Sequence, residues 1–123
     1  MSEPVFDKQD QFDKVAAGLL DGERIVAVYD AIGARTGFLA ITNYRVVLQD
    51  NSFVGKKVAL TSLPFARINA VSLVSDKSIL GQFASAGTLA VTVGSETYEV
   101  DFRGDEKARY AHDAILWHMV HAR

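Results

Sequence analysis

The feature that most constrains the fold of this chain is a succession of short strand-like runs between Glu23 and Phe102. In each run, β-branched and aromatic residues alternate with polar ones, and small turn residues separate one run from the next. Links this short join antiparallel neighbours, because a parallel crossover needs a dozen or more residues. The sequence therefore predicts an antiparallel meander of seven strands, over residues 24–31, 37–42, 45–50, 57–63, 67–75, 88–93 and 97–102.

The stretch "GFLAITNYRVVLQD", residues 37–50, shows the pattern at its clearest. Two hydrophobic runs flank Asn43, a residue that tolerates the positive φ of tight turns. A second hairpin is expected at Gly94-Ser95, with glycine at the first central position. Seven antiparallel strands with one polar face must form a sandwich or curl, and curling removes most exposed edges. We predict a mainly β fold, a seven-stranded antiparallel barrel or split sandwich.

Helical periodicity flanks the strands on both sides. Over about residues 5–20, apolar side chains recur at the spacing that places them on one helical stripe, and Gly22 offers a left-handed stop. Over about residues 105–122, acidic residues occupy the first turn, as the helix dipole favours. A helical wheel gives this second helix two apolar faces. One face carries Ala108, Ala111, Ile115, Met119 and Ala122, and the other carries Tyr110, Trp117 and Val120.

Composition places the chain among ordinary globular proteins of about one domain, which we expect to span residues 1–123. The chain has 123 residues, a formal net charge of -2 and no cysteine, so disulfides and thiolate metal sites are excluded. The mildly acidic balance argues against nucleic acid, which requires a concentrated basic face. The first residues lack the uninterrupted apolar core of a signal peptide, so we expect a cytoplasmic location.

Motifs for catalysis, cofactors and metals are missing from the sequence. It contains no glycine-rich phosphate loop, no G-x-S-x-G elbow and no nucleophile with an evident base, so we expect no enzyme activity and no cofactor. His118 and His121 stand three residues apart on the second helix, but no cysteine or suitably placed carboxylate accompanies them. We expect no metal site, and interpret these histidines as surface or interface groups.

The candidate partner-binding residues lie on the second helix and in a long connection. Trp and Tyr are frequent interface anchors, which points to Tyr110, Trp117 and Val120. The alternative is that the first helix covers this face within one chain. Residues 76–87 form the longest connection, and its Leu80 and Phe83 are candidates for contact with a partner. The expected partner is a second copy of the chain or another protein.

The basic residues give a weaker candidate site. Lys56-Lys57 is the only adjacent basic pair and follows the apolar Phe53-Val54, while Arg35 lies in another predicted loop. Each basic residue near an anionic leaflet contributes about 1 kcal/mol, so these three would give only weak adsorption. Peripheral membrane or small-anion binding through Arg35, Lys56 and Lys57 is therefore the alternative function.

Three short motifs occur in a fixed order along the chain. They are a leading "LL-x-GE", a hairpin "G-x-L-x-I-T-N-x-R-V" and a strand that runs into "L-P-F-x-x-I". In this order and spacing the whole chain resembles the bacterial pleckstrin-homology-like domain family. The residues that carry the resemblance are Leu19, Leu20, Gly22, Glu23, Gly37, Leu39, Ile41, Thr42, Asn43, Arg45, Val46, Leu63, Pro64, Phe65 and Ile68.

The resemblance implies a bent seven-stranded barrel or split sandwich with a C-terminal capping helix. It implies a binding or scaffolding module, not an enzyme, and some members of the family look like ring-forming homo-oligomers. It does not carry over a ligand. Eukaryotic domains that bind phosphoinositides have several basic residues between the first two strands, whereas this chain has "DAIGARTG" there, with Arg35 alone.

Overall fold

The structure is a computed structural model that describes residues 3–33, 35–51, 55–74 and 87–122. Within these residues, two helices and eight strands follow one another, with one short 3-10 helix between the fifth and sixth strands. The elements are β1 (Val5–Phe6), α1 (Gln9–Ala16), β2 (Ile25–Asp30), β3 (Thr36–Thr42), β4 (Arg45–Asp50), β5 (Ala59–Pro64), η1 (Phe65–Arg67), β6 (Ala70–Val74), β7 (Gly87–Val93), β8 (Glu96–Phe102) and α2 (Asp105–His121).

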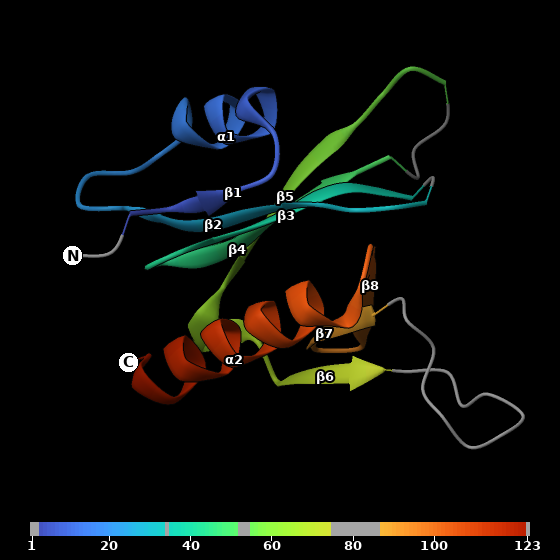
Figure 1. Ribbon diagram of the computed structural model, residues 1–123. Helices are drawn as coiled ribbons and strands as arrows, with labels where there is room; N and C mark the ends of the chain where they lie inside the picture. The colour runs from blue at the N-terminus through green and yellow to red at the C-terminus, as the bar shows by residue number, and fades with distance from the viewer. Residues whose placement is uncertain (1–2, 34, 52–54, 75–86, 123) are drawn as a thin grey trace, which may run out of the picture.

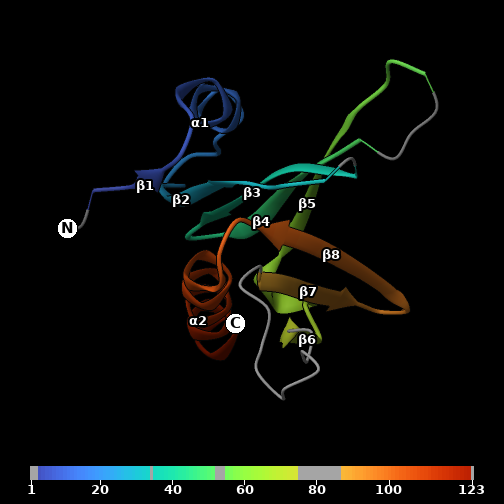
Figure 2. The same ribbon diagram turned by 45° about the vertical axis from the view of Figure 1, so that its right-hand side comes forward.

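The strands form two sheets that share one core. A five-stranded sheet has the order β1-β2-β3-β4-β5, and a three-stranded sheet has the order β6-β7-β8. Helix α1 lies on one face of the five-stranded sheet, while α2 and the three-stranded sheet lie on the other (Figure 1). The turned view in Figure 2 keeps the two helices on opposite sides of that sheet. The prediction of a mainly β fold with two flanking helices is confirmed.

The predicted number of strands is wrong, and so is the barrel, one of the two predicted architectures. The described residues form eight strands in two sheets, and these sheets do not close into a barrel. The additional strand is β1, which pairs parallel to β2 through Val5 and Phe6. This segment was predicted as part of a helix over residues 5–20, but α1 is shorter at both ends. A two-residue strand is too short to show an alternating pattern, and only its pairing with β2 defines it.

The seven predicted strands all occur, and no boundary differs from its prediction by more than three residues. The Gly94 turn adopts the positive φ, +62°, that its glycine permits. Asn43 does not, because the described residues include no non-glycine residue with positive φ. Its side chain instead accepts a hydrogen bond from the Arg24 N–H and donates one to the Gly22 carbonyl, at 2.7 and 3.1 Å. Asn43 thus fixes the hairpin by side-chain hydrogen bonds.

Both faces of β3 are buried, which explains why its sequence is almost continuously hydrophobic. Leu39 and Ile41 point into the main core between the sheets, where they meet Phe102 and Ile115. The alternate residues of β3 belong to a second cluster under α1. That cluster consists of Val15, Val28, Phe38, Ala40 and Val47, with Phe12, Leu19 and Ile25 at its margin.

A buried ion pair holds the hairpin of β3 and β4 against the segment that precedes β2. The Glu23 carboxylate accepts hydrogen bonds from Arg45 Nε and Nη2 at 2.8 and 3.0 Å. It also accepts bonds from the Thr42 hydroxyl at 2.6 Å and from the Leu20 N–H at 2.9 Å. Burial would raise the pKa of Glu23, but the bonds from Arg45, Thr42 and Leu20 and the charge of Arg45 outweigh it, so the pKa is lowered.

The guanidinium of Arg45 also ties in two further segments. Its Nη2 donates to the Gly18 carbonyl after α1 at 2.9 Å, and its Nη1 donates to the Ser62 hydroxyl on β5 at 2.8 Å. A planar guanidinium can donate in several directions at once, which suits it to such a junction. The motif residues Glu23, Thr42 and Arg45 therefore have a structural role, and the site must be sought elsewhere.

Candidate functional site

Helix α2 has one buried face and one exposed face, as its sequence predicts. Ala108, Ala111 and Ile115 are buried in the main core, and Met119 and Ala122 pack against it. The opposite side carries large hydrophobic side chains that remain open to solvent: Tyr110 is 67% exposed, Trp117 59% and Val120 70%. The last turns of the helix thus present an apolar surface that the fold itself does not use.

Sequence reasoning missed one member of this surface. Leu116 is 42% exposed and stands four residues before Val120, so both lie on the same side of the helix. The spacing from Val120 was the signal that could have identified it. We call Tyr110, Leu116, Trp117 and Val120 the outer α2 surface.

Helix α1 does not cover the outer α2 surface, so the alternative that it does is wrong. Its Val15 packs on Val28, Phe38 and Val47, on the other side of the five-stranded sheet from α2 (Figure 1). In Figure 2 the five-stranded sheet lies above α2 and the three-stranded sheet lies to its right. Within the described residues, no other element shields Trp117 or Val120 from solvent.

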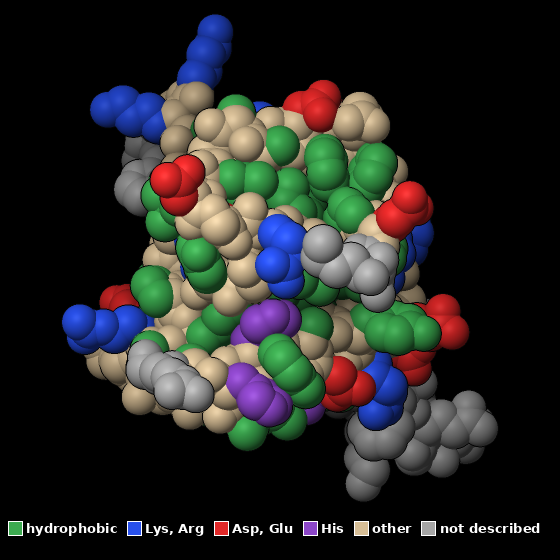
Figure 3. Space-filling view, turned by 90° about the vertical axis from the view of Figure 1, so that its left-hand side faces the viewer, with side chains coloured by type: hydrophobic (Ala, Val, Ile, Leu, Met, Phe, Trp, Pro, Cys, Tyr) green, Lys and Arg blue, Asp and Glu red, His purple; other side chains and the backbone are tan. Residues whose placement is uncertain are grey.

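Two histidines make ring contacts at the end of the outer α2 surface. The ring of His121 stacks on Trp117 with centroids 4.0 Å apart, and His118 stacks on Phe65 of η1 at 4.7 Å. Each histidine Nδ1 lies 2.7 to 2.8 Å from the carbonyl four residues earlier in the helix. Figure 3 shows histidine and hydrophobic side chains side by side on this part of the molecule. Among the residues that the structure describes, no group of three or more ligating side chains could hold a metal ion.

Charged residues of both signs border the outer α2 surface. Asp105 and Glu106 lie in the first turn of the helix, and Arg109 and Asp113 are exposed along the same side. Asp113 lies 2.9 Å from His112 Nδ1. Among the described residues, neither Glu106 nor Arg109 forms an ion pair. Their charges are therefore available to a partner.

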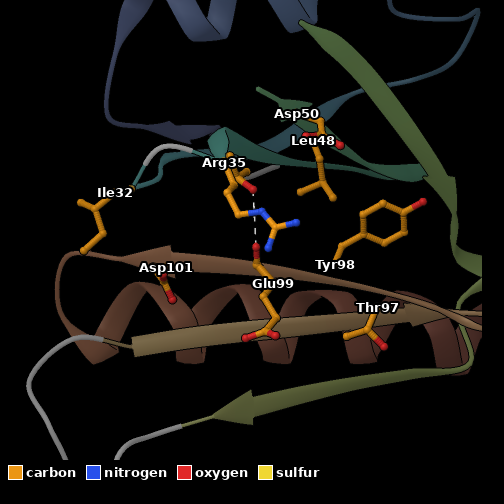
Figure 4. A pocket seen from close by; sticks show the side chains of 10 residues that line it. Ile32, Arg35, Leu48, Asp50, Thr97, Tyr98, Glu99 and Asp101 are labelled. Carbon is orange, nitrogen blue, oxygen red and sulfur yellow. Dashed lines mark hydrogen bonds between the residues drawn. The ribbon is translucent and has the colours of Figure 1, made fainter. Parts of the chain in front are cut away.

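Arg35 lies apart from the two lysines with which it was grouped. It lines a cavity of about 260 Å³ between the ends of β3 and β4 and the strand β8, together with Leu48 and Tyr98 (Figure 4). The Thr36 hydroxyl donates a hydrogen bond across this cavity to the Glu99 carbonyl, at 3.4 Å. Asp50, Glu99 and Asp101 also belong to its lining, and the side chains of Glu99 and Asp101 point away from Arg35 (Figure 4).

Lys56 and Lys57 are exposed where the hairpin of β4 and β5 projects from the body of the protein (Figure 1). They do not line the cavity that holds Arg35. Phe53 and Val54, the apolar residues that precede them, lie outside the described residues, as do Leu80 and Phe83 of the long connection. The structure therefore places neither of these two apolar pairs.

The family of the chain follows from its match to a family model. The model of the bacterial PH domain matches residues 3–119. The chain belongs to the bacterial PH domain family. No curated protein matches it. None of the described helices of this bacterial PH domain is long and apolar enough to span a membrane.

Solved structures share the fold at low sequence identity. A pleckstrin homology domain from Shewanella amazonensis SB2B is 19% identical, with a TM-score of 0.68 over 93% of this chain and 99% of that chain. A DUF1696 family protein with a pleckstrin-homology domain from Shewanella loihica PV-4 is 17% identical, with a TM-score of 0.62 over 92% and 94%. A PH domain containing protein from Exiguobacterium sibiricum 255-15 is 19% identical, with a TM-score of 0.64 over 93% and 61%.

Proposed function

We propose that this bacterial PH domain is a non-catalytic protein-interaction and self-assembly module of the cytoplasm, and that the outer α2 surface makes the contact. The observation that carries the proposal is the exposure of Trp117, Tyr110 and Val120 on one side of a helix whose other side packs against the main core. Exposed aromatic and aliphatic side chains that gather on one surface are typical of protein interfaces.

The energetics of such a contact are hydrophobic. Each large side chain that becomes well buried stabilises the contact by about 1.5 to 3 kcal/mol, and the outer α2 surface supplies four of them. The stacking of His121 on Trp117 holds the largest side chain in one orientation before a partner arrives. A side chain that is already ordered loses less conformational freedom on binding.

The experiment is the absolute mass of the purified protein, measured by light scattering after size exclusion across about a tenfold range of concentration. We expect a multimer for the natural sequence and a monomer for Trp117→Asp, with an unchanged far-ultraviolet circular dichroism spectrum. Leu20→Asp is the matched control, because Leu20 is 61% exposed and does not belong to α2. A natural sequence that stays monomeric, or a Trp117→Asp variant with unchanged mass, would contradict the proposal.

Weak binding to anionic membranes is a second candidate function, supported by a run of exposed residues on the β4–β5 hairpin. Lys56 and Lys57 are followed by Val58, which is 57% exposed. Basic and apolar side chains in succession suit a lipid surface, although two lysines provide only about 2 kcal/mol. Binding to anionic vesicles at low salt should disappear in Lys56→Glu/Lys57→Glu, and no binding by the natural sequence would end this candidate.

A further inference from the structure

Strand β5 forms one edge of the five-stranded sheet, and this edge is open. The strand pairs only with β4, and among the described residues its backbone has no hydrogen bond on the other side. Native edge strands are commonly protected by a charged side chain, a bulge or a covering element, because unpaired N–H and C=O groups are a template for another strand. The stretch "VALTSL", residues 58–63, is uncharged, and β5 pairs with β4 without a register shift. Within the described part of the chain, the edge therefore lacks that protection.

The free backbone groups of this edge belong to alternate residues. The Phe65 N–H donates to the Tyr44 carbonyl at 3.4 Å, so the residue that follows β5 points its N–H towards β4. Hydrogen-bonded and non-bonded positions alternate in an antiparallel pair, which turns the N–H groups of the odd-numbered residues of β5 towards β4 as well. The N–H and C=O groups of Leu60 and Ser62 therefore point outwards. Pro64 shares this outward set, and an edge strand tolerates proline where the missing N–H would face solvent.

Side chains next to this edge are exposed. Leu60 is 49% exposed and pairs with Gln49, and Val58 is 57% exposed. Lys14 of α1 donates to Gln49 at 2.9 Å, but Leu60 on the next strand remains uncovered by the helix. The hairpin that contains these residues projects from the body of the protein (Figure 1). An extended segment that pairs with β5 would place alternate side chains beside Leu60 on this face of the sheet.

Basic residues stand at both ends of the edge. Lys56 and Lys57 precede β5, Arg67 follows it in η1, and all three are exposed. None of the three forms an ion pair among the described residues. The sequence has no Asp or Glu in residues 51–75, and Asp50 on β4 lines the cavity between the two sheets. The β5 edge therefore complements a partner that carries negative charge.

We propose that β5 pairs with an extended acidic segment of another protein, which adds a strand to this edge of the five-stranded sheet. Main-chain hydrogen bonds to Leu60 and Ser62 give the affinity, and carboxylates at the ends of the segment meet the basic residues. The same charges disfavour edge-to-edge pairing of two copies, because an antiparallel arrangement brings Lys56 and Lys57 of one copy to Arg67 of the other. This inference goes beyond the function proposed above, since it concerns a surface that does not include α2.

Titration with a synthetic peptide tests the inference. The probe is a capped, fluorescently labelled peptide of about eight residues, in which valine and threonine alternate between pairs of glutamates. A control peptide carries lysines in place of the glutamates. We expect saturable binding of the acidic peptide by fluorescence anisotropy, no binding of the lysine peptide, and affinity about tenfold weaker in Lys56→Glu/Lys57→Glu. Arg103→Glu is the matched control for the loss of positive charge, because Arg103 is exposed and lies after β8.

Amide hydrogen exchange shows whether the peptide pairs with the edge. In the free protein the N–H groups of Leu60 and Ser62 should exchange quickly with deuterium, whereas the N–H of Leu63, which points towards β4, exchanges slowly. The acidic peptide should slow exchange at Leu60 and Ser62 and leave Leu63 unchanged. Leu60→Pro removes one outward N–H and keeps the bonds to β4, so binding should be lost. Leu60→Thr is the matched control, because it keeps the N–H, and it should bind the peptide.

Several outcomes would overturn the inference. They are no binding of the acidic peptide at low salt, equal binding of the acidic and lysine peptides, and binding that leaves exchange at Leu60 and Ser62 unchanged. Slow exchange at these two residues in the free protein, rising with its concentration, would mean that a second copy occupies the edge. Binding to anionic vesicles without binding of the peptide would support the membrane candidate instead. Trp117→Asp should bind the peptide as the natural sequence does, so this inference and the function proposed above can fail separately.

Discussion

The carboxylate of Glu23 accepts two hydrogen bonds from the guanidinium of Arg45, and its side chain has no exposed area at all. Arg45 keeps 20% of its side chain exposed, so the pair lies at the edge of the core. Two-point pairing of this kind is among the strongest in proteins, and its geometry fixes both partners. The ion pair thereby determines how the β3–β4 hairpin sits against the chain that follows α1.

Arg45→Met should reduce the free energy of unfolding by about 3 kcal/mol, because it leaves the Glu23 carboxylate buried without its cation. Urea denaturation monitored by circular dichroism at pH 7 measures the change. Arg103→Met is the matched control, since Arg103 is exposed and has no ion pair among the described residues, and surface changes of this type stay within about 0.5 kcal/mol. Equal effects of the two substitutions would show that the ion pair is not needed for stability.

Acid should weaken the same network. The pKa of Glu23 is lowered in the folded protein, so its contribution to stability is complete above its unfolded pKa of about 4.3. The contribution is lost as the pH falls below that value, through the folded pKa. We expect the urea midpoint of the natural sequence to fall between pH 5 and pH 3. In Glu23→Gln the midpoint at neutral pH should be lower and should change less with acid, and parallel pH profiles would contradict this assignment.

Gly87→Ala should destabilise the protein by about 1 to 3 kcal/mol, the usual range for overpacking. A Cβ atom at Gly87 would stand 2.8 Å from the Cβ of Ala108 and 2.9 Å from the Cα of Asp105, where α2 begins against β7. Thermal unfolding should show a lower midpoint. Gly18→Ala is the control, because its added Cβ meets only the Val15 carbonyl at 3.9 Å. A Gly87→Ala variant as stable as the control would mean that α2 can shift on the sheet.

Alkaline titration should distinguish Tyr29 from the other three tyrosines. Burial raises the pKa of Tyr29, with smaller contributions from the negative charge of Asp7 and from Tyr110. We expect a late phase in the absorbance change of tyrosine ionisation, beyond about pH 10, and its loss in Tyr29→Phe. The stability that neutral Tyr29 contributes is present below about pH 10 and is lost as the pH rises through the folded pKa. A titration of Tyr29→Phe that keeps the late phase would assign it to another tyrosine.

The strands could be predicted from the sequence because their hydrophobic pattern is local. Runs such as residues 45–50 occur as predicted, and α2 begins at the predicted residue and ends within one residue of it. The strand β1 could not be predicted in this way, because two residues carry no period and only the pairing of Val5 and Phe6 with β2 creates it. Sheet closure depends on how far two sheets separate in space, which a one-dimensional pattern does not encode.

The candidate site could likewise be predicted from the sequence only in part. The helical wheel identified the exposed side of α2, since the position of a residue on a helix follows from its number. The location of α1 could not be predicted, because a stripe such as Phe12, Val15 and Leu19 can pack equally well on a helix or on a sheet. The grouping of Arg35 with Lys56 and Lys57 relied on charge alone, and in the structure neither lysine lines the cavity that holds Arg35.

Because the two hydrophobic clusters are separate, one part of the protein can unfold locally while the rest stays folded. Helix α1 is held mainly by the small cluster on the outer face of the five-stranded sheet, so it can detach without breaching the main core. Amide protons of α1 should then exchange with deuterium sooner than those of β3, which is covered on both faces. Each such opening uncovers Val28, Phe38 and Val47 together. Helix α1 thus shields an apolar surface from contact with other molecules. Removal of its residues 9–16 would expose this surface and favour aggregation under conditions where the rest of the protein is still folded.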